Sequence, residues 1–207
     1  MLRVKSLLLI ALLCYFVAPL EGDVTLTKNS IEHFIPLPLT RQSTDYTCGA
    51  AAVLSIHGYF GENPLEVDLV SPLQLTSAFG TDRKSMESYF QSIGYEISVH
   101  EPMSLSNLKE YLSEGHPVLC LVQAWDNQKD YTNYWGIGHY IIAIGYDQER
   151  IYFMDPWILG NYGYISIGEF MNRWHQQAAD GTQVIQWGLA ILKEKSIYNT
   201  DELKYIP

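Results

Sequence analysis

Hydrophobic positions in the first half of the chain recur at the three- and four-residue spacing of amphipathic helices. Most of these runs begin beside a capping residue or a proline and end at a glycine, which supports the same boundaries. In the second of them, Leu65, Leu69 and Val70 are expected to face inward. The pattern predicts helices over residues 48–58, 64–70, 81–93 and 105–114, with a short strand over 95–99.

The pattern changes beyond Pro117, where short continuous apolar runs typical of buried strands replace the helical spacing. A polar and aromatic loop over 125–137 separates the first two runs. Helices followed by strands favour a single α+β domain over 23–207, with an N-terminal helical lobe and a C-terminal antiparallel sheet. The predicted strands cover 117–124, 138–145, 151–154, 164–167 and 184–192, and a short helix covers 168–177.

Residues 1–22 differ from the rest of the chain. Arg3 and Lys5 give a basic start, an almost wholly apolar run follows over 7–17, and Pro19 ends it. This is the layout of a secretory signal peptide that is cleaved on export. The alternative is an uncleaved membrane anchor, for which the apolar run is short. We therefore expect a secreted or periplasmic protein without stable membrane insertion after cleavage.

Composition and charge exclude several classes of protein. The chain has 207 residues, of which 47% are hydrophobic, and a formal net charge of −10. The hydrophobic content excludes a disordered chain, and the length supports one domain with a sizeable core. An acidic surface repels nucleic acid and anionic lipid, so neither is an expected partner.

Cys48 stands at the predicted start of the first helix, where Asp45 and Thr47 are candidate capping residues. The unpaired N–H groups and partial positive charge of a helix start favour the thiolate, which is the nucleophilic form of cysteine. Gly49 leaves room for a neighbouring element to approach the sulfur. Gln42 carries a side-chain amide six positions before the cysteine. Together with the backbone N–H of Cys48, that amide is suited to hold a developing oxyanion.

His139 opens an apolar strand, and Asp155 follows sixteen positions later at the end of the next strand. A hairpin brings such strand ends together, so that Asp155 orients the imidazole and the other ring nitrogen faces the thiol. Taken singly, the histidine is an ordinary strand residue and the Asp-Pro pair is an ordinary turn. A Cys/His/Asp trio also binds zinc in some proteins, but no CxxC or HxxxH spacing is present. We predict no metal and no cofactor.

Two further groups of residues have competing interpretations. Cys120 lies in a continuous apolar run and is expected to be an inert buried thiol. The alternative is a disulfide between Cys48 and Cys120, which would leave the Gln, His and Asp pattern unexplained. Aromatic side chains flank the histidine and the aspartate, and they form either a substrate groove or ordinary packing at the sheet rim. The aromatic residues predicted to bind substrate are Trp135, Tyr140 and Trp157.

The stretch over 37–192 resembles the C39-like branch of the papain-like cysteine peptidases. The resemblance rests on Gln42, the Cys48-Gly49 pair, the sequence around His139 and the Asp155-Pro156 pair, in this order along the chain. It implies a papain-like fold, with the nucleophile on a helix in one lobe and the base on a sheet in the other. It also implies a Cys-His-Asp triad that hydrolyses peptide bonds through an acyl-enzyme, acting as a monomer on a peptide or protein.

The resemblance and the signal peptide together favour an exported bacterial thiol peptidase. Familiar members of the family are cytosolic-facing domains of peptide exporters that cut leader peptides after a double glycine. This chain has a signal peptide in place of their membrane and ATPase parts, so double-glycine specificity is not carried over to it. Two alternatives stay open: a non-catalytic papain-like peptide-binding module, and an amidase or acyltransferase that uses the same triad.

Overall fold

The computed structural model describes residues 31–125, 130–136, 138–193, 198–199, 201–203 and 205–206. The predicted signal peptide, residues 1–22, lies outside the described residues. The helices are α1 (Cys48–Tyr59), α2 (Glu66–Leu69), α3 (Arg83–Ser92), α4 (Leu105–Ser113) and α5 (Ile167–Arg173). The strands are β1 (Ile97–His100), β2 (Val118–Val122), β3 (His139–Tyr146), β4 (Arg150–Met154), β5 (Gly163–Ser166), β6 (His175–Gln177), β7 (Gln183–Ile185) and β8 (Gly188–Ile191).

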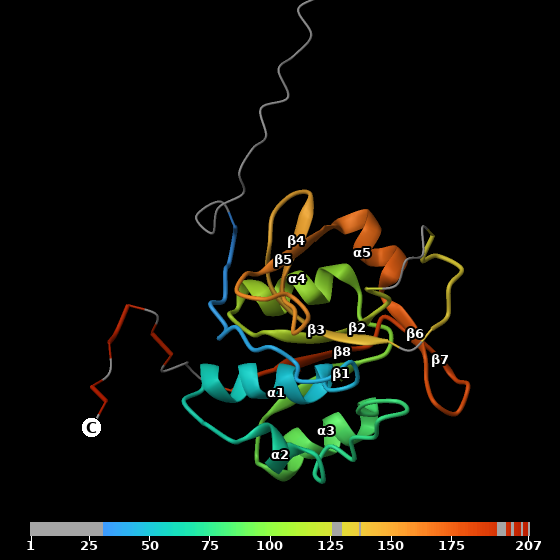
Figure 1. Cartoon of the computed structure of the whole chain (residues 1–207). Helices are drawn as coiled ribbons and strands as arrows, with labels where there is room; N and C mark the ends of the chain where they lie inside the picture. Colours follow the sequence, from blue (N-terminus) through green and yellow to red (C-terminus); the bar gives the residue numbers. More distant parts are fainter. Residues whose placement is uncertain are drawn as a thin grey trace, which may run out of the picture.

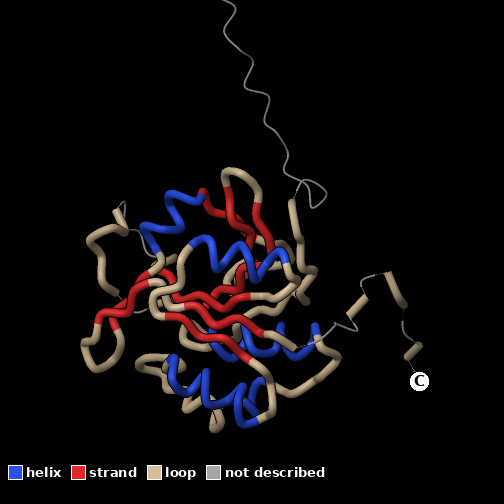
Figure 2. The backbone as a smooth tube through the Cα atoms, turned by 180° about the vertical axis from the view of Figure 1, so that it is seen from behind, coloured by secondary structure: helices blue, strands red, loops and turns tan. Residues whose placement is uncertain are grey.

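A six-stranded sheet forms the centre of the molecule, in the order β1-β8-β2-β3-β4-β5, and every neighbouring pair is antiparallel. Helices α1 and α3 lie on one side of this sheet, and α4 and α5 lie on the other (Figure 1). The view from behind shows the same three layers (Figure 2). The predicted α+β class with an antiparallel sheet is therefore confirmed.

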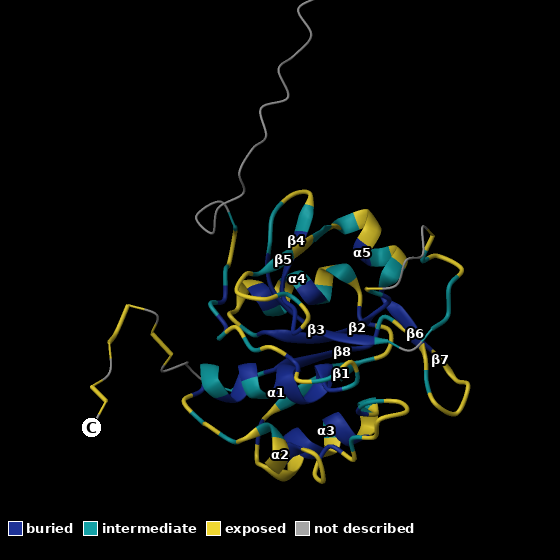
Figure 3. Ribbon diagram, viewed as in Figure 1, coloured by how far each residue is buried: buried dark blue, intermediate teal, exposed yellow. Residues whose placement is uncertain are grey.

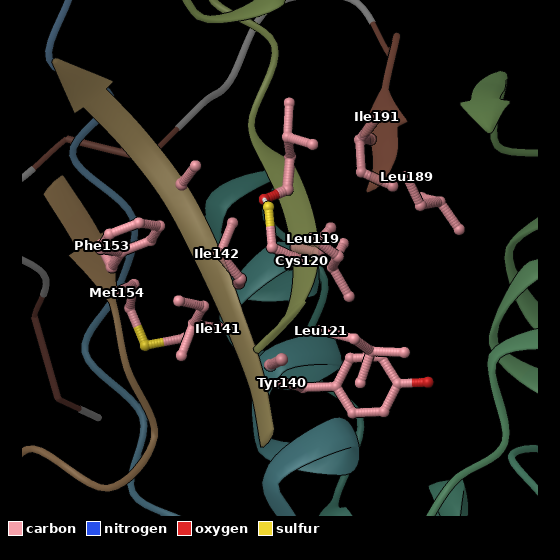
Figure 4. Packing of buried hydrophobic residues seen from close by; sticks show 14 of the residues in the cluster. Leu119, Cys120, Leu121, Tyr140, Ile141, Ile142, Phe153, Met154, Leu189 and Ile191 are labelled. Carbon is pink, nitrogen blue, oxygen red and sulfur yellow. Dashed lines mark hydrogen bonds between the residues drawn. The ribbon is translucent and has the colours of Figure 1, made fainter. Parts of the chain in front are cut away.

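The core lies on both faces of the central strands. Every residue of β2 is buried, as is every residue of β3 before Tyr146 (Figure 3). Helices cover both faces, which explains why these strands are continuously apolar rather than alternating. Side chains from β2, β3, β4 and β8 meet in this cluster (Figure 4). Cys120 is fully buried there, and burial raises the pKa of its thiol far above the ordinary value, so this thiol is inert.

The C-terminal third differs from the predicted order. The predicted helix over 168–177 ends at Arg173, and His175 instead begins β6, which pairs with β7 in a separate two-stranded sheet. The predicted strand over 184–192 is divided into β7 and β8 by Gln186, whose φ is 51°. The N–H of Gln186 donates to the carbonyl of Trp174 at 2.8 Å. These boundaries are determined by which strands pair with one another, and the local pattern of apolar residues does not predict that pairing.

Two predictions in the N-terminal half also change. Helix α2 begins at Glu66 rather than at Pro64, and of the three residues expected inside only Leu69 is buried, while Leu65 and Val70 are exposed. A four-residue helix presents one side chain to the core, which is why the longer inward stripe was wrong. Helix α4 packs on β2 and β3 across the sheet from α1, so the N-terminal helices do not all belong to one lobe (Figure 1). Within the described residues, none of the helices has both the length and the apolar character needed to cross a membrane.

Candidate active site

Helix α1 begins at Cys48, as the sequence predicted, and its first turn lies against β3. Thr47 occupies the N-cap position, but its hydroxyl turns back into the preceding loop. There it accepts hydrogen bonds from the backbone N–H groups of Ser43 and Thr44, each at 3.1 Å. The Thr47 hydroxyl therefore stabilises the loop and does not cap the helix. The thiol of Cys48 lies at the N-terminal end of α1, which carries the partial positive charge.

The glycine after Cys48 allows two neighbours to approach closely. A Cβ added to Gly49 would lie 3.1 Å from the Cβ of Thr81 and 3.2 Å from the Tyr140 ring. Both distances are tighter than ordinary side-chain contact, so a larger residue at position 49 would displace these neighbours. The expectation that Gly49 leaves room for another element beside the sulfur is confirmed, and that element is the start of β3.

Strands β3 and β4 bring His139 and Asp155 together. Met154 ends β4 opposite Ile142, so the residue after it lies beside the first residues of β3. His139 Nε2 and Asp155 Oδ1 are 2.6 Å apart, and both side chains are buried. This bond leaves Nδ1 of the imidazole for the thiol of Cys48, and the two groups shift each other's pKa toward the charged forms. The structure therefore brings together the three residues predicted to form the triad.

Electrostatics favour the charged form of the Cys48–His139 pair. Burial raises the pKa of Cys48, but the hydrogen bond and charge of His139 and the N–H groups of Tyr140 and Gly49 outweigh it, and the pKa falls below its ordinary value. Burial lowers the pKa of His139, whereas its bonds to Asp155 and Cys48 raise it, to about 9. Between these two ionisations the pair exists as thiolate and imidazolium, the state that a thiol nucleophile requires.

Asp155 is held by more than the histidine. Its Oδ1 also accepts the backbone N–H of Trp157 at 2.8 Å, and its Oδ2 accepts the indole N–H of Trp125 at 2.9 Å. Trp125 was not among the predicted site residues. It is the first residue of the predicted 125–137 loop, and nothing in its sequence neighbourhood marks it out from the other aromatic residues there.

Gln42 is buried at the other wall of the site. Its backbone N–H donates to the carbonyl of Pro156 at 3.1 Å, which ties the loop before α1 to the segment after β4. Its side-chain Nε2 donates to the carbonyl of Thr44 at 2.6 Å. A carbonyl only accepts, so this bond determines which end of the amide carries the hydrogens, and it uses one of the two Nε2 hydrogens.

Gln42, Cys48 and His139 line a cleft of about 350 Å³, and Asp155 lies behind the histidine. Trp157 lies at its rim, and Tyr140 forms part of its wall, with the phenol donating to the carbonyl of Thr81 at 3.2 Å. Trp135 lies outside it, in a neighbouring pocket with Phe79, where its ring packs 4.5 Å from the ring of His175. The cleft is lined by Gln42, Asp45, Tyr46, Cys48, Ser77, Ala78, Phe79, Gly80, Thr81, Leu121, Ala124, Trp125, Gly138, His139, Tyr140, Trp157 and Gln176.

Competing interpretations of these residues find no support in the geometry. Cys48 and Cys120 are both free, so the alternative disulfide does not form. In the part of the chain that the structure describes, no three His, Cys, Asp or Glu side chains gather as a metal site. The site thus combines a candidate nucleophile, a candidate base bonded to a carboxylate, and two candidate donors for an oxyanion.

A family model described as the Peptidase_C39 like family matches residues 34–181. The chain belongs to this family. The match includes Gln42 and all three triad positions. A search of curated proteins found no match.

Several solved structures share the fold. The peptidase domain of Streptococcus ComA, a bi-functional ABC transporter involved in a quorum sensing pathway, is 18% identical, with 76% of this chain and 97% of that chain covered and a TM-score of 0.56. A protein described as a C39-like peptidase from Bacillus anthracis is 16% identical, with 79% and 97% covered and a TM-score of 0.57. A double glycine motif protease from an AMS/PCAT transporter, in complex with the leader peptide, is 16% identical, with 76% and 93% covered and a TM-score of 0.53.

Proposed function

We propose that this chain is an exported thiol peptidase that cleaves peptide bonds through Cys48, His139 and Asp155. The observation that carries the proposal is the buried His139–Asp155 bond at 2.6 Å, with Cys48 and His139 lining the same cleft and each shifting the other's pKa toward the charged form. Burying a charged pair of this kind costs free energy, because its charges are removed from water. Shifted pKa values at a cleft are typical of catalytic groups.

In the proposed reaction the thiolate of Cys48 attacks the carbonyl carbon of the substrate. The electron pair of the carbonyl moves to its oxygen, which then bears the negative charge of a tetrahedral intermediate. The N–H of Cys48 and the amide of Gln42 are the donors proposed to stabilise that charge. His139, protonated by the thiol, returns the proton to the leaving amine as the C–N bond breaks.

The resulting thioester is resolved by water. His139, now neutral, accepts a proton from the water as its oxygen attacks the acyl carbon, and the thiolate leaves. Asp155 keeps Nε2 of His139 engaged in both steps, so that Nδ1 always faces the reacting atoms. The carboxylate itself takes no proton in this scheme.

The substrate proposed for the cleft is a peptide. A fold relative has been solved with its leader peptide bound, which supports a peptide in the equivalent groove here. Trp157 at the cleft rim is the aromatic residue best placed to contact a substrate side chain, and Tyr140 shapes the wall behind it. No feature of the cleft lining assigns double-glycine leader cleavage to this chain.

One experiment separates the proposed activity from its alternatives. The purified protein without residues 1–22 is incubated with a diverse peptide library, and the products are identified by mass spectrometry. Cleavage is expected from the parent and from Cys120→Ala, which loses a buried thiol outside the cleft, but not from Cys48→Ala. Binding of peptides by the parent without cleavage would support the non-catalytic module instead. Products that carry an added amine would indicate an acyltransferase.

Export is proposed from residues 1–22 alone and has its own test. The basic and then apolar order of this segment predicts that it is removed as the protein leaves the cytoplasm. N-terminal sequencing of exported material is expected to begin near residue 23. Exported protein that still begins at Met1 would contradict cleavage, and a chain lacking the segment is expected to remain in the cell.

A further inference from the structure

The carboxylate of Asp155 accepts hydrogen bonds on both of its oxygens. Oδ1 accepts from His139 Nε2 at 2.6 Å and from the backbone N–H of Trp157 at 2.8 Å. Oδ2 accepts from the indole of Trp125 at 2.9 Å. Any residue except proline at position 157 would supply the backbone donor. The contact to Oδ2, in contrast, depends on the side chain at position 125.

Trp125 has a backbone conformation that bulky residues rarely adopt. Its φ is 59°, in the left-handed region. Its side chain is also 54% exposed, and its ring lies 6.3 Å from that of Trp157. An unusual backbone conformation persists only where the surroundings determine it, and such residues concentrate at functional sites. The inward indole N–H bond to the buried carboxylate is the contact that accounts for this placement.

The same residue lines two cavities. One is the cleft with Cys48, and the other is a pocket of about 280 Å³. Asp155 lines the second pocket, together with apolar side chains such as Ile141 and Phe153. Trp125 and Ala124 line both cavities, so the indole is part of the wall between them. Loss of the ring would join the two spaces beside the carboxylate.

We propose that Trp125 is a positioning residue whose indole N–H holds Oδ2 of Asp155, so that Oδ1 stays directed at His139. This inference rests on the proposed function of the triad. Without the indole donor, only the two bonds on Oδ1 restrain rotation of the carboxylate about its Cβ–Cγ bond, and the contact to His139 weakens. The imidazolium form of His139 is then less stable, and its pKa falls toward the ordinary value. The ionisation of Cys48 opposite the imidazolium is affected much less.

Alkylation of Cys48 by iodoacetamide tests this without any peptide. The rate is measured against pH, and the site of alkylation is verified by mass spectrometry. The profile is expected to show a lower step for ionisation of Cys48 and an upper step for loss of the His139 proton. In Trp125→Phe the upper step is expected to fall by about one pH unit, while the lower step stays in place. Peptide cleavage, measured as kcat/KM, is expected to fall ~10-fold.

Trp187→Phe is the matched control. Its indole also donates to a carboxylate, that of Glu87 at 3.1 Å, outside the cleft. Both alkylation steps are expected to stay in place in this variant. In an Asp155→Ala background, Trp125→Phe is expected to cause no further shift, because the residue acts through that carboxylate.

Three outcomes would overturn the proposal: an unchanged profile in Trp125→Phe, an equal shift in Trp187→Phe, or an upward shift of both steps. The last would show that the indole acts only as a dipole. A parent that alkylates with two steps but cleaves no peptide would overturn the proposed function and still test Trp125. Trp125→Ala, which also opens the wall between the cavities, is expected to shift the upper step at least as far as Trp125→Phe.

Discussion

Each end of α1 holds a buried histidine against a carboxylate. At the first turn, His139 Nε2 is 2.6 Å from Asp155, and at the last turn, His57 Nδ1 is 2.5 Å from Glu62. The contacts are almost the same length, yet the pKa of His139 is raised to about 9 and that of His57 is lowered. A short His–carboxylate contact therefore does not by itself make an acid–base catalyst.

The surroundings of the two pairs explain the difference. Burial lowers the pKa of both histidines, but His139 faces a second anionic partner in the thiolate of Cys48. The carboxylate opposite His57 is shared with Lys193, whose positive charge further lowers the pKa of that histidine. Nε2 of His57 also contacts the phenol of Tyr89 at 2.7 Å. His57 is thus a neutral structural residue that ties the end of α1 to α3.

The largest expected effect separates the two histidines by function. His139→Ala is expected to reduce peptide cleavage by about 10⁴-fold or more, because both proton transfers are lost. His57→Ala is expected to keep cleavage per folded molecule but to lower the free energy of unfolding by about 1–3 kcal/mol, because Glu62 and Tyr89 lose a partner. Urea denaturation and kcat/KM on both variants check this. If His57→Ala abolished cleavage in folded protein, the comparison between the two ends of α1 would fail.

A smaller expected effect distinguishes Gln42, which is proposed to stabilise the oxyanion, from Asp155, which is proposed to orient His139. Gln42→Ala is expected to slow peptide cleavage by ~10²-fold and to leave iodoacetamide alkylation nearly unchanged, because alkylation develops no oxyanion. Asp155→Ala is expected to reduce both rates, and Asp155→Asn to do so less, because an amide oxygen still accepts the imidazole N–H. An equal loss of both rates in Gln42→Ala would mean that Gln42 holds the loop rather than the oxyanion.

Cys48 and Cys120 give a third contrast. At pH 6, roughly three units below the pKa of an ordinary thiol, Cys48 is expected to react with iodoacetamide because its thiolate is stabilised. Cys120 is expected to react only after denaturation, because it is fully buried with a raised pKa. Counting alkylated thiols by mass spectrometry, with and without denaturant, checks this. Equal labelling of both cysteines in the native protein would remove the basis for an activated nucleophile.

The smallest effect concerns pH and stability. Because the pKa of His57 is lowered on folding, the unfolded chain binds more protons than the folded one in the acid range. The contribution of neutral His57 to stability is fully present above pH 6.5, the ordinary pKa of histidine. It is lost as the pH falls toward the lower pKa of His57 in the folded protein. His57→Gln is therefore expected to lose less stability than the parent between neutral and mildly acidic pH. Urea titrations of both proteins at the two pH values check the sign.

The Cys48–His139 pair is expected to contribute little to the same profile. Between pH 6.5 and about pH 9, His139 keeps a proton in the folded protein that it has lost in the unfolded chain. Its contribution to stability therefore declines as the pH rises through that window. The pKa of Cys48 is lowered from its ordinary value of 9.0, so below that pH the folded protein has lost a thiol proton that the unfolded chain keeps. The contribution of Cys48 to stability therefore grows as the pH rises. The two changes have opposite sign and largely offset each other, which makes His57 the clearer group for the stability measurement.

The sequence by itself determined the parts of this protein that depend on local chemistry. The helix start at Cys48, the strand that opens at His139 and the Asp155-Pro156 turn follow from capping, apolar runs and proline geometry. Because β3 and β4 are joined by a short turn, the sixteen-residue separation was enough to predict that His139 and Asp155 meet. The α+β class followed from the order of helical and strand patterns.

Only the tertiary structure decided the contacts between segments that are distant in the chain. Trp125 reaches Asp155 across thirty positions, and Lys193 reaches Glu62 across 131. The pairing of β6 with β7 and the burial of α2 on a single leucine were decided in the same way. A side chain in a polar loop has no periodic pattern around it, so its partner is determined by how the sheet and helices pack. That packing gave one His–carboxylate pair a thiolate neighbour and the other a lysine.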